Sequence, residues 1–250
     1  MTRISAFLCF LFTVVSLLTV RAIAGEAVTY DVNGNAYEGY YSPAEKGAPL
    51  VLLVHDWDGL TDYEIKRATM LNELGYSVFA ADLFGKGVRP TEVKDKRQHT
   101  GELYKDREKM RAILNGSVAK AGELGANTSN LVAAGYCFGG AAVLELARSG
   151  ADLKGFATFH GGLMTPEGQD YSQTKGKILV LHGSADTAIT MDQFADLTEQ
   201  LEQAGISHEM ITYSGAPHAF TVFGSDRYRK DADQASWARF NAFLEEVTAQ

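Results

Sequence analysis

Three residues of this chain have the side chains of a nucleophile, an acid and a base, and they occur in that order along the sequence. Cys137 lies in "GYCFG", Asp186 in "HGSADTAIT" and His218 in "APHAF". A thiolate is a strong nucleophile, a histidine can take or hold the thiol proton, and a carboxylate can orient the imidazole and stabilise its charged form. These residue types together predict hydrolysis through an acyl-thioester intermediate.

Each of the three also has an ordinary structural interpretation. A free cysteine such as Cys137 packs like a small apolar residue, and His218 can be a buried structural histidine. Asp186 can be a helix N-cap, since aspartate is favoured there. Asp192 is a second candidate for the acid, but it falls inside the helix expected over Met191–Ala204. The position of each residue relative to the strands therefore decides between these readings.

The surroundings of Cys137 favour catalysis. Gly135 and Gly139 frame it in a Gly-x-Cys-x-Gly pattern, after the apolar run Asn130–Tyr136 and before the helical pattern Gly139–Ser149. Such glycines let a strand turn sharply into a helix and expose the nucleophile between them. The N–H groups at the start of the helix stabilise a thiolate. The sequence has no Gly-x-Ser-x-Gly, so no serine competes for this role.

The elements that must position these residues alternate along the chain. Segments 27–32 and 36–41 flank Asn33-Gly34-Asn35, which predicts a β-hairpin. Further strands are expected at Pro49–His55, Tyr76–Asp82, Asn130–Tyr136, Lys154–His160, Gly176–Gly183 and His208–Ser214. Helices are expected at Tyr63–Leu74, Leu103–Leu124, Gly139–Ser149, Met191–Ala204 and Lys230–Val247.

This alternation predicts an α/β fold with one mostly parallel central sheet and helices on both faces. In such sheets the ligand site lies beyond the carboxyl ends of the strands. Cys137, Asp186 and His218 each follow a predicted strand. The pattern therefore predicts that they meet at one edge of the sheet.

An acyl-transfer site also needs two backbone N–H groups to stabilise the tetrahedral oxyanion. One is expected from Phe138, directly after the nucleophile, and the other from Trp57 in the loop "VHDWDGLTD". His55 and Asp56 occupy the same strand end. His55 either lines the substrate site or is a hydrogen-bonded structural residue, and Trp57 is alternatively a wall of the pocket.

Other polar stretches receive simpler interpretations. The charged segment 94–111 is most simply a solvated helix, and its place between two central strands also makes it a candidate lid. His160 and His182 end strands and either bond to nearby backbone or line the site. The sequence shows no His, Cys or carboxylate spacing typical of a metal site, so neither a metal nor another cofactor is predicted.

The N-terminus has the pattern of an export signal. A short positive region at Thr2-Arg3 precedes the apolar run Ile4–Val20, and "AIA" offers a cleavage site before Gly25. We therefore expect residues 1–24 to be a signal peptide, residues 25–250 to be one domain, and the protein to be secreted or periplasmic. An uncleaved anchor is the alternative.

Removal of residues 1–24 leaves 21 basic against 31 acidic residues. A net charge near −10 argues against nucleic acid or an anionic membrane as a partner. Cys137 would then be the remaining cysteine, so no internal disulfide is expected. An odd thiol in an exported chain is either buried or reactive. The composition does not decide between a monomer and a homodimer.

Several stretches resemble the dienelactone hydrolase family of α/β-hydrolases. They are "LLVHDWDGLTDYEIKRA", "AADLFGKGVRP", "AAGYCFGGAAVLELARSGADLKGFATFHGG", "KILVLHGSADTAIT" and "YSGAPHAFT". The resemblance implies an α/β-hydrolase fold, a Cys137–His218–Asp186 triad, and cofactor-free hydrolysis of an ester or enol lactone. It further implies that Asp56, where the family has glutamate, modulates the thiol.

The resemblance also bears on the substrate. It implies that Arg107 holds a substrate carboxylate, whereas the position of a second family arginine, four residues after His218, is Val222. Because a thiolate leaves more readily than an alkoxide, acylation requires an enolate or phenolate leaving group. We therefore expect activity on aryl esters and enol lactones, and little on amides or triglycerides. A catalytically inactive scaffold that binds a ligand or partner is the alternative.

Overall fold

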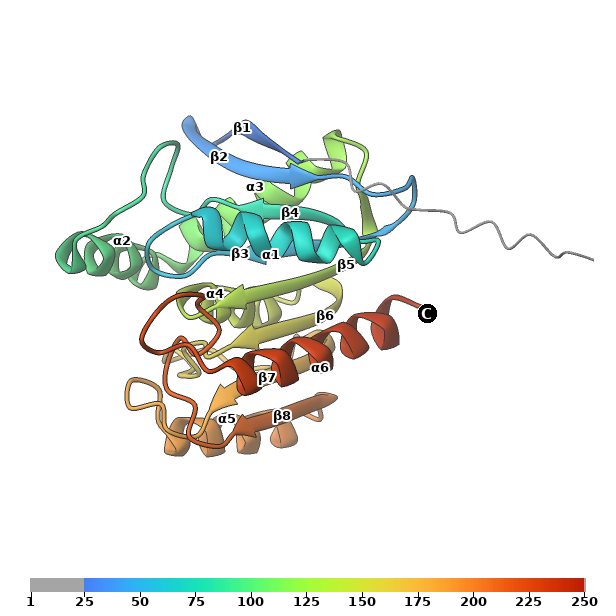
Figure 1. The fold of residues 1–250 in the computed structure, drawn as a ribbon. Helices are drawn as coiled ribbons and strands as arrows, with labels where there is room; N and C mark the ends of the chain where they lie inside the picture. The colour runs from blue at the N-terminus through green and yellow to red at the C-terminus, as the bar shows by residue number, and fades with distance from the viewer. Residues whose placement is uncertain (1–24, 250) are drawn as a thin grey trace, which may run out of the picture.

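The computed structural model describes residues 25–249, and these form one eight-stranded sheet with helices on both faces (Figure 1). The predicted signal peptide lies outside the described residues. The strands are β1 (Glu26–Val32), β2 (Asn35–Ser42), β3 (Pro49–Val54), β4 (Ser77–Ala81), β5 (Asn127–Tyr136), β6 (Asp152–Phe159), β7 (Lys175–Gly183) and β8 (His208–Tyr213). The helices are α1 (Asp62–Glu73), α2 (Val93–Lys105), α3 (Arg107–Glu123), α4 (Phe138–Arg148), α5 (Met191–Gln203) and α6 (Lys230–Thr248).

The sheet has the order β1-β2-β4-β3-β5-β6-β7-β8. The pairs β1/β2 and β2/β4 are antiparallel, and all pairs from β4/β3 to β7/β8 are parallel. The expected β-hairpin is therefore confirmed, with Asn33 and Gly34 at φ of 53° and 79° in its two-residue turn. Positive φ at both central residues is the geometry that joins twisted antiparallel strands.

Two apolar layers hold the helices on the sheet. Side chains of β3 alternate between them: Leu50, Leu52 and Val54 face one layer, and Val51 and Leu53 face the other. The first layer receives α3, α4 and α5, and the second receives α1 and α6. Because both faces of the central strands are covered, these strands are continuous apolar runs.

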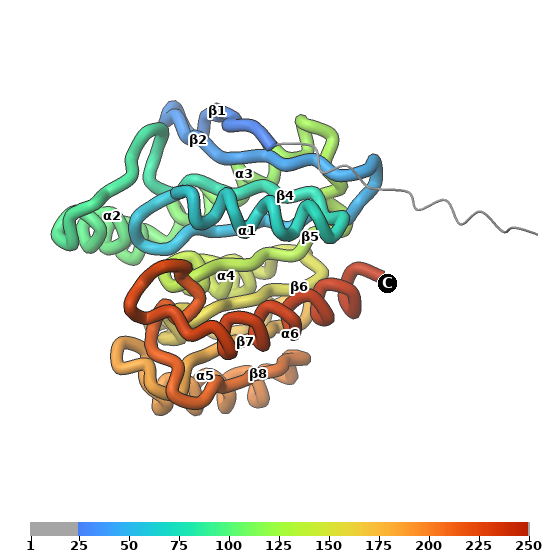
Figure 2. Tube along the Cα trace, viewed as in Figure 1, coloured from blue at the N-terminus to red at the C-terminus, as the bar shows by residue number. Residues whose placement is uncertain are grey.

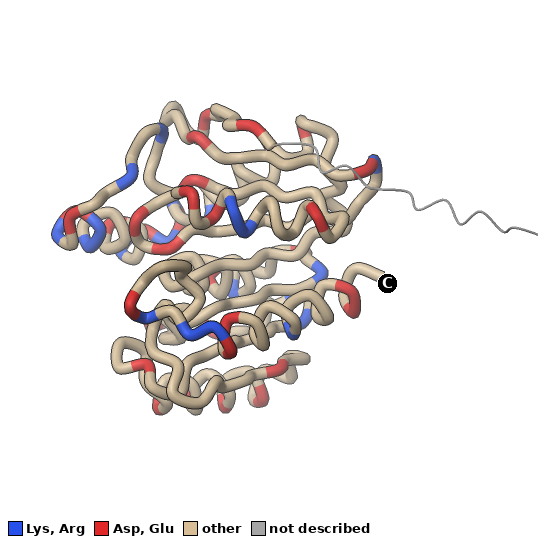
Figure 3. Tube along the Cα trace, in the orientation of Figure 1, with Lys and Arg blue, Asp and Glu red and all other residues tan. Residues whose placement is uncertain are grey.

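The carboxyl ends of the parallel strands gather at one side of the molecule. They point to the left in Figures 1 and 2, where α2 and the loop between β8 and α6 also lie. Acidic and basic residues are interspersed along the chain in the same view (Figure 3). Within residues 25–249, no helix combines the length and apolar composition needed to cross a bilayer.

The single helix expected over Leu103–Leu124 is wrong, because two helices meet at Asp106. The backbone of Asp106 has φ −115° and ψ 82°, which breaks the helical path. Its carboxylate accepts the Lys109 N–H at 2.9 Å and thereby caps α3. Asp106 thus ends α2 and starts α3, so the charged segment 94–111 is divided between α2, which lies beside the strand ends, and the first turn of α3.

Candidate active site

Cys137 lies in a sharp turn between β5 and α4. It has φ 50° and ψ −111°, a conformation that few residues other than glycine adopt. The turn is possible because its flanking residues have no side chains. A Cβ on Gly135 would overlap the backbone of Gly139, and a Cβ on Gly139 would overlap the carbonyl oxygen of Val54. The sharp strand-to-helix turn that the Gly-x-Cys-x-Gly pattern predicts is therefore present.

The predicted acid, base and thiol form one hydrogen-bonded chain. The Cys137 Sγ lies 3.0 Å from the His218 Nε2, and the His218 Nδ1 lies 2.7 Å from the Asp186 Oδ2. The three residues come from the ends of β5, β7 and β8, which are distant in sequence. The His218 ring is mostly buried and the Asp186 carboxylate fully so, so water competes little for these bonds.

The environment favours the charged form of His218. Burial alone would lower its pKa, but the hydrogen bonds to Asp186 and Cys137 outweigh burial and raise the pKa of His218 to about 10. An imidazolium beside the sulfur stabilises a thiolate. The Cys137 sulfur therefore faces a ring whose charged form is favoured.

Asp186 is bonded to His218 and is not a helix cap. The N-cap of α5 is Thr190. The Asp186 Oδ1 accepts the N–H groups of Ala188 and Ile189 at 2.8 and 2.9 Å, which leaves Oδ2 for the histidine. Burial would raise the pKa of Asp186, but the hydrogen bond from His218 and those two N–H groups hold it below its ordinary value.

The two N–H groups expected to bind an oxyanion lie on neighbouring segments. Phe138 is the first residue of α4, so its N–H has no acceptor within the helix. The start of α4 packs against the end of β3, as the close approach of Gly139 to the Val54 and His55 carbonyls shows. Trp57 follows in the loop after β3, where its ring packs against the core and lies 5.3 Å from the Lys96 Nζ.

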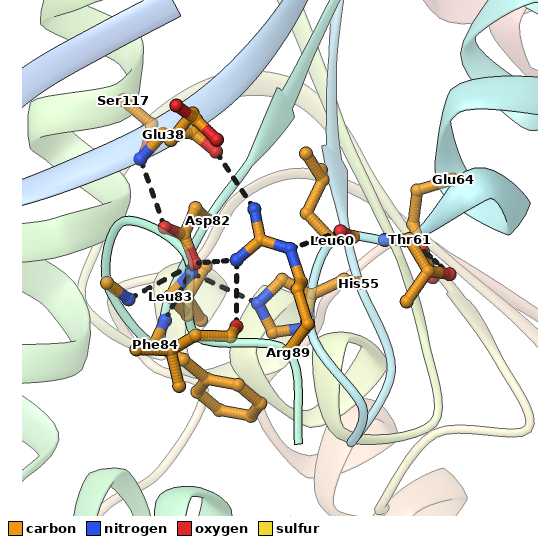
Figure 4. Close-up of polar contacts among 12 residues, drawn as sticks. Glu38, His55, Leu60, Thr61, Glu64, Asp82, Leu83, Phe84, Arg89 and Ser117 are labelled. Atoms are coloured by element: carbon orange, nitrogen blue, oxygen red, sulfur yellow. Dashed lines mark hydrogen bonds and ion pairs between the residues drawn. The ribbon is translucent and has the colours of Figure 1, made fainter. Parts of the chain in front are cut away.

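The loop after β3 is anchored by an arginine and a buried aspartate (Figure 4). Asp82 follows β4, is fully buried, and accepts the N–H groups of Phe84 and Gly85. Arg89 lies 3.4 Å from the Asp82 carboxylate and donates to the Leu60 carbonyl. This contact ties the loop that carries Trp57 to the end of β4.

His55 has the structural role that was the alternative to substrate contact. Its side chain is completely buried, and the Leu83 N–H donates to its Nε2 at 3.0 Å. The Nδ1 therefore carries the proton and donates to the Asp56 carbonyl at 2.6 Å. Burial lowers the pKa of His55, so the ring is neutral. A substrate cannot reach it without rearrangement.

The Asp56 carboxyl group is buried among other acids. Its Oδ1 accepts the Asp58 N–H at 3.1 Å, and no hydrogen bond joins it to Cys137 within residues 25–249. Burial, the side chain of Asp58 and the charge of Glu64 raise the pKa of Asp56 to about 10. Asp56 therefore carries a proton at neutral pH in the folded chain.

We expect Asp56→Asn to stabilise the protein increasingly as pH rises. The folded-state pKa of Asp56 lies above the unfolded value near 3.8, so folding takes up a proton between these limits. The stability of the wild type falls with rising pH there, by up to about 1.4 kcal/mol per unit, and asparagine removes this dependence. Urea unfolding at about pH 5, 7 and 9 measures the difference. A constant difference across this range would contradict the assignment.

The same variant tests whether Asp56 modulates the thiol. If it does, the rate of Cys137 alkylation by iodoacetamide should change in Asp56→Asn at constant pH. Because no hydrogen bond joins Asp56 to Cys137 within residues 25–249, we expect the alkylation rates of wild type and Asp56→Asn to agree within about twofold.

A cavity of about 320 Å³ lies beside the backbone of Cys137. Gly162 is part of the cavity wall, and its N–H donates to the Cys137 carbonyl at 3.4 Å, which places the cavity next to Cys137. Its apolar wall consists of Leu163, Met164 and Ile189, and α2 adds Tyr104. The ring of Tyr104 also packs edge-on against Phe138 at 5.4 Å. Tyr104 was not singled out from the sequence, although it lies three residues before Arg107, on the other side of the break at Asp106.

Arg107, which the family resemblance implies holds a substrate carboxylate, lines this cavity. Its Nε–H donates to the Tyr104 carbonyl at 2.9 Å. Its guanidinium lies 3.6 Å from the carboxylate of Glu145, a fully buried residue of α4 that also pairs with Arg111 and Arg148. Arg107 and Arg148 both line the cavity, and with Arg111 they surround the single carboxylate of Glu145, so positive charge predominates in this cluster.

The remaining candidates are placed as follows. Asp192 is exposed on α5 and is not part of the hydrogen-bonded chain. His182 is buried, and its Nε2 lies 3.0 Å from the Ile189 carbonyl oxygen. His160 is buried beside His218, with 5.4 Å between the ring centroids. The described part of the chain contains no group of three or more His, Cys, Asp or Glu arranged to hold a metal ion.

A mostly parallel sheet with a nucleophile turn after β5 defines an α/β-hydrolase fold. Comparisons with known proteins make this more specific. The model of the dienelactone hydrolase family matches residues 37–248, so the chain belongs to that family.

Individual relatives are distant but match over most of their length. Protein usf of Aquifex pyrophilus is 25% identical over 89% of this chain and 98% of that protein. A putative carboxymethylenebutenolidase of Methylorubrum extorquens is 27% identical over 79% of this chain and 72% of that protein. A crystal structure of a dienelactone hydrolase-like promiscuous phosphotriesterase from metagenomic libraries has a TM-score of 0.83 and 26% identity, and covers 91% of this chain and 99% of the other. The chain is therefore similar to hydrolases of lactones and esters.

Proposed function

We propose that this protein hydrolyses activated carboxylic esters and enol lactones with Cys137 as the nucleophile. The observation that carries the proposal is the chain from the Cys137 thiol through the His218 ring to the Asp186 carboxylate, at 3.0 and 2.7 Å. Such a chain is the arrangement that nucleophilic acyl transfer requires. Membership of the dienelactone hydrolase family and the similarity to a putative carboxymethylenebutenolidase support a lactone or ester substrate.

The reaction proceeds in two halves. The Cys137 proton resides on the His218 Nε2, and the thiolate attacks the carbonyl carbon. The N–H groups of Phe138 and Trp57 stabilise the resulting oxyanion. Collapse of this intermediate breaks the bond to the leaving oxygen, which takes the proton from His218. Water then attacks the acyl thioester while His218 accepts its proton, and the thiol and a carboxylic acid are released.

The leaving group limits the substrates. The first tetrahedral intermediate expels either the thiolate or the oxygen of the ester, and the better leaving group departs. An enolate or phenolate competes with the thiolate, whereas an alkoxide or an amide nitrogen does not. The apolar wall formed by Leu163, Met164 and Ile189 suits a ring or short chain in the acyl part. We further propose that Arg107 faces a polar or anionic end of the substrate.

A substrate panel tests this proposal. For the purified protein we expect turnover of phenyl and nitrophenyl esters and of an enol lactone, and at least about 10³-fold lower kcat/KM for the matching anilide. An aryl phosphotriester belongs in the panel, because one similar structure is described as a promiscuous phosphotriesterase. Efficient hydrolysis of the anilide would contradict the leaving-group argument. Absence of turnover together with slow alkylation of Cys137 would instead favour an inactive binding scaffold.

We also propose that the protein acts outside the cytoplasm, on the basis of the N-terminal pattern over residues 1–24. When the full chain is expressed in a Gram-negative host, we expect the mature protein in the periplasm or medium with Gly25 as its first residue. Mass spectrometry of each fraction measures this. A chain that starts with Met followed by Gly25 is the control and should stay in the cytoplasm. Recovery of the uncleaved full chain from the cytoplasm would contradict the proposal.

A further inference from the structure

A buried hydrogen-bonded chain reaches the segment that carries His218. Thr221, three residues after His218, is completely buried. Its Oγ1 lies 2.7 Å from the Tyr63 hydroxyl and 2.8 Å from the His160 Nε2, and its carbonyl accepts from the Arg67 Nη2 at 2.9 Å. One threonine thus joins α1, the end of β6 and the loop after β8.

The other end of this chain is a buried ion pair. Arg67 of α1 pairs with Asp233 of α6, and both side chains are nearly inaccessible. The Arg67 Nε also donates to the Tyr63 hydroxyl at 3.3 Å, and the Tyr228 hydroxyl donates to Asp233 at 3.1 Å. Four aromatic rings surround the guanidinium within 6 Å, those of Tyr63, Tyr136, Phe223 and Trp237. The buried pair thus links α1 to α6 through charge-assisted hydrogen bonds, and we call it the anchor.

His160 connects the anchor to the catalytic ring. It has a φ of 40°, and its N–H donates to the Leu181 carbonyl at 2.8 Å, which fixes its place after β6. Its ring packs edge-on against the His218 ring at 5.4 Å and 66°. Burial and the nearby His218 hold the pKa of His160 well below the ordinary value, so its ring stays neutral. A neutral ring can contact an imidazolium without charge repulsion.

We propose that the chain Asp233–Arg67–Tyr63–Thr221–His160 positions the imidazole of His218, so that Thr221, Tyr63 and His160 are positioning residues of the reaction. This inference rests on the proposed function. Among the described residues, none of these side chains hydrogen-bonds to Cys137 or lines the 320 Å³ cavity. They act by limiting the rotation of the His218 ring and the displacement of its loop, which keeps Nε2 within reach of the sulfur.

Thr221→Val tests the proposal, because valine keeps the shape and removes the hydroxyl that joins Tyr63 to His160. The Arg67 bond to the backbone carbonyl remains. We expect kcat for an aryl ester to fall about 10- to 100-fold while KM stays within about twofold, since the cavity is unchanged. Alkylation of Cys137 by iodoacetamide should slow in parallel. Thr221→Ser restores the hydroxyl and should recover most of kcat.

Two further variants make the result decisive. Thr198→Val is the matched control, since the Thr198 hydroxyl bonds to the Phe194 carbonyl within α5, and it should leave kcat unchanged. Tyr63→Phe removes a single hydroxyl from the chain and replaces Thr221→Val if the latter does not fold; kcat should again fall with KM constant. Wild-type kcat in a folded Thr221→Val or Tyr63→Phe protein overturns the inference. Full activity of Cys137→Ala would instead overturn the proposed function.

Discussion

Cys137→Ala is expected to lower kcat/KM for an aryl ester by at least about 10⁴-fold, which corresponds to about 5.5 kcal/mol of activation free energy. Alanine has no atom that can form the acyl intermediate, so neither half of the reaction can occur through the enzyme. The oxyanion-binding N–H groups and the cavity remain, and residual hydrolysis above the buffer rate measures their contribution. Steady-state kinetics with a nitrophenyl ester provides the measurement.

Cys137→Ser is the companion variant. Serine fits the same turn, and its hydroxyl lies where His218 can accept its proton. An alkoxide is a poorer leaving group than a thiolate, so the serine variant should gain relative preference for alkyl esters over aryl esters. Thermal unfolding of wild type and both variants controls for loss of fold. Retention of more than about one tenth of the wild-type rate by Cys137→Ala would exclude the thiol as the nucleophile.

Asp186→Asn is expected to lower kcat by about 10³- to 10⁴-fold with little change in fold. The asparagine carbonyl can still accept the Ala188 and Ile189 N–H groups that now bind Oδ1. Its amide then faces the Nδ1 of His218 and donates to it, so the proton of the neutral ring moves to Nε2. In that tautomer the ring cannot accept the proton of Cys137.

Asp192→Asn provides the matched control for this experiment. It makes the same chemical change in an exposed carboxylate of the neighbouring helix α5, and we expect kcat within about twofold of wild type. The ratio of the two effects distinguishes the orienting role from a general change in charge. Equal losses in both variants, or none in Asp186→Asn, would assign the acid to another residue.

The strand ends explain why the candidate site could be predicted. Cys137, Asp186 and His218 each follow an apolar run with turn residues after it, and parallel strands bring such positions to one edge. The prediction needed only local patterns and the rule of strand placement. The structure brings the three side chains together at hydrogen-bond distance.

The break between α2 and α3 was missed because the helical periodicity continues across it. Lys105, Asp106 and Arg107 are all compatible with a solvated helix. The available signal was Asp106 itself, since aspartate is favoured at an N-cap and here accepts the Lys109 N–H. The cap stabilises a helix start at Asp106, whereas a continuous helix would gain one more helical residue there. The pattern of apolar positions is the same in both cases, so it does not predict the break.

The contacts around Arg67 and Glu145 could not be predicted from local patterns. Arg67 and Asp233 are 166 residues apart, and Glu145 meets arginines from α3 and from its own helix. Both Arg67 and Glu145 lie on helices where a charged residue normally indicates a solvated face. Only the packing of one helix against another reveals that these charges are buried and paired.

The backbone conformation of Cys137 places selection for stability in conflict with selection for the proposed activity. A residue with φ 50° and ψ −111° is held in a sparsely populated conformation that glycine adopts without strain. The proposed nucleophile is thus the residue that selection for stability alone would replace. When a lineage no longer needs the hydrolase, a single change to glycine would make the chain inert and more robust at once, and the reverse change would restore the thiol to a ready-made turn.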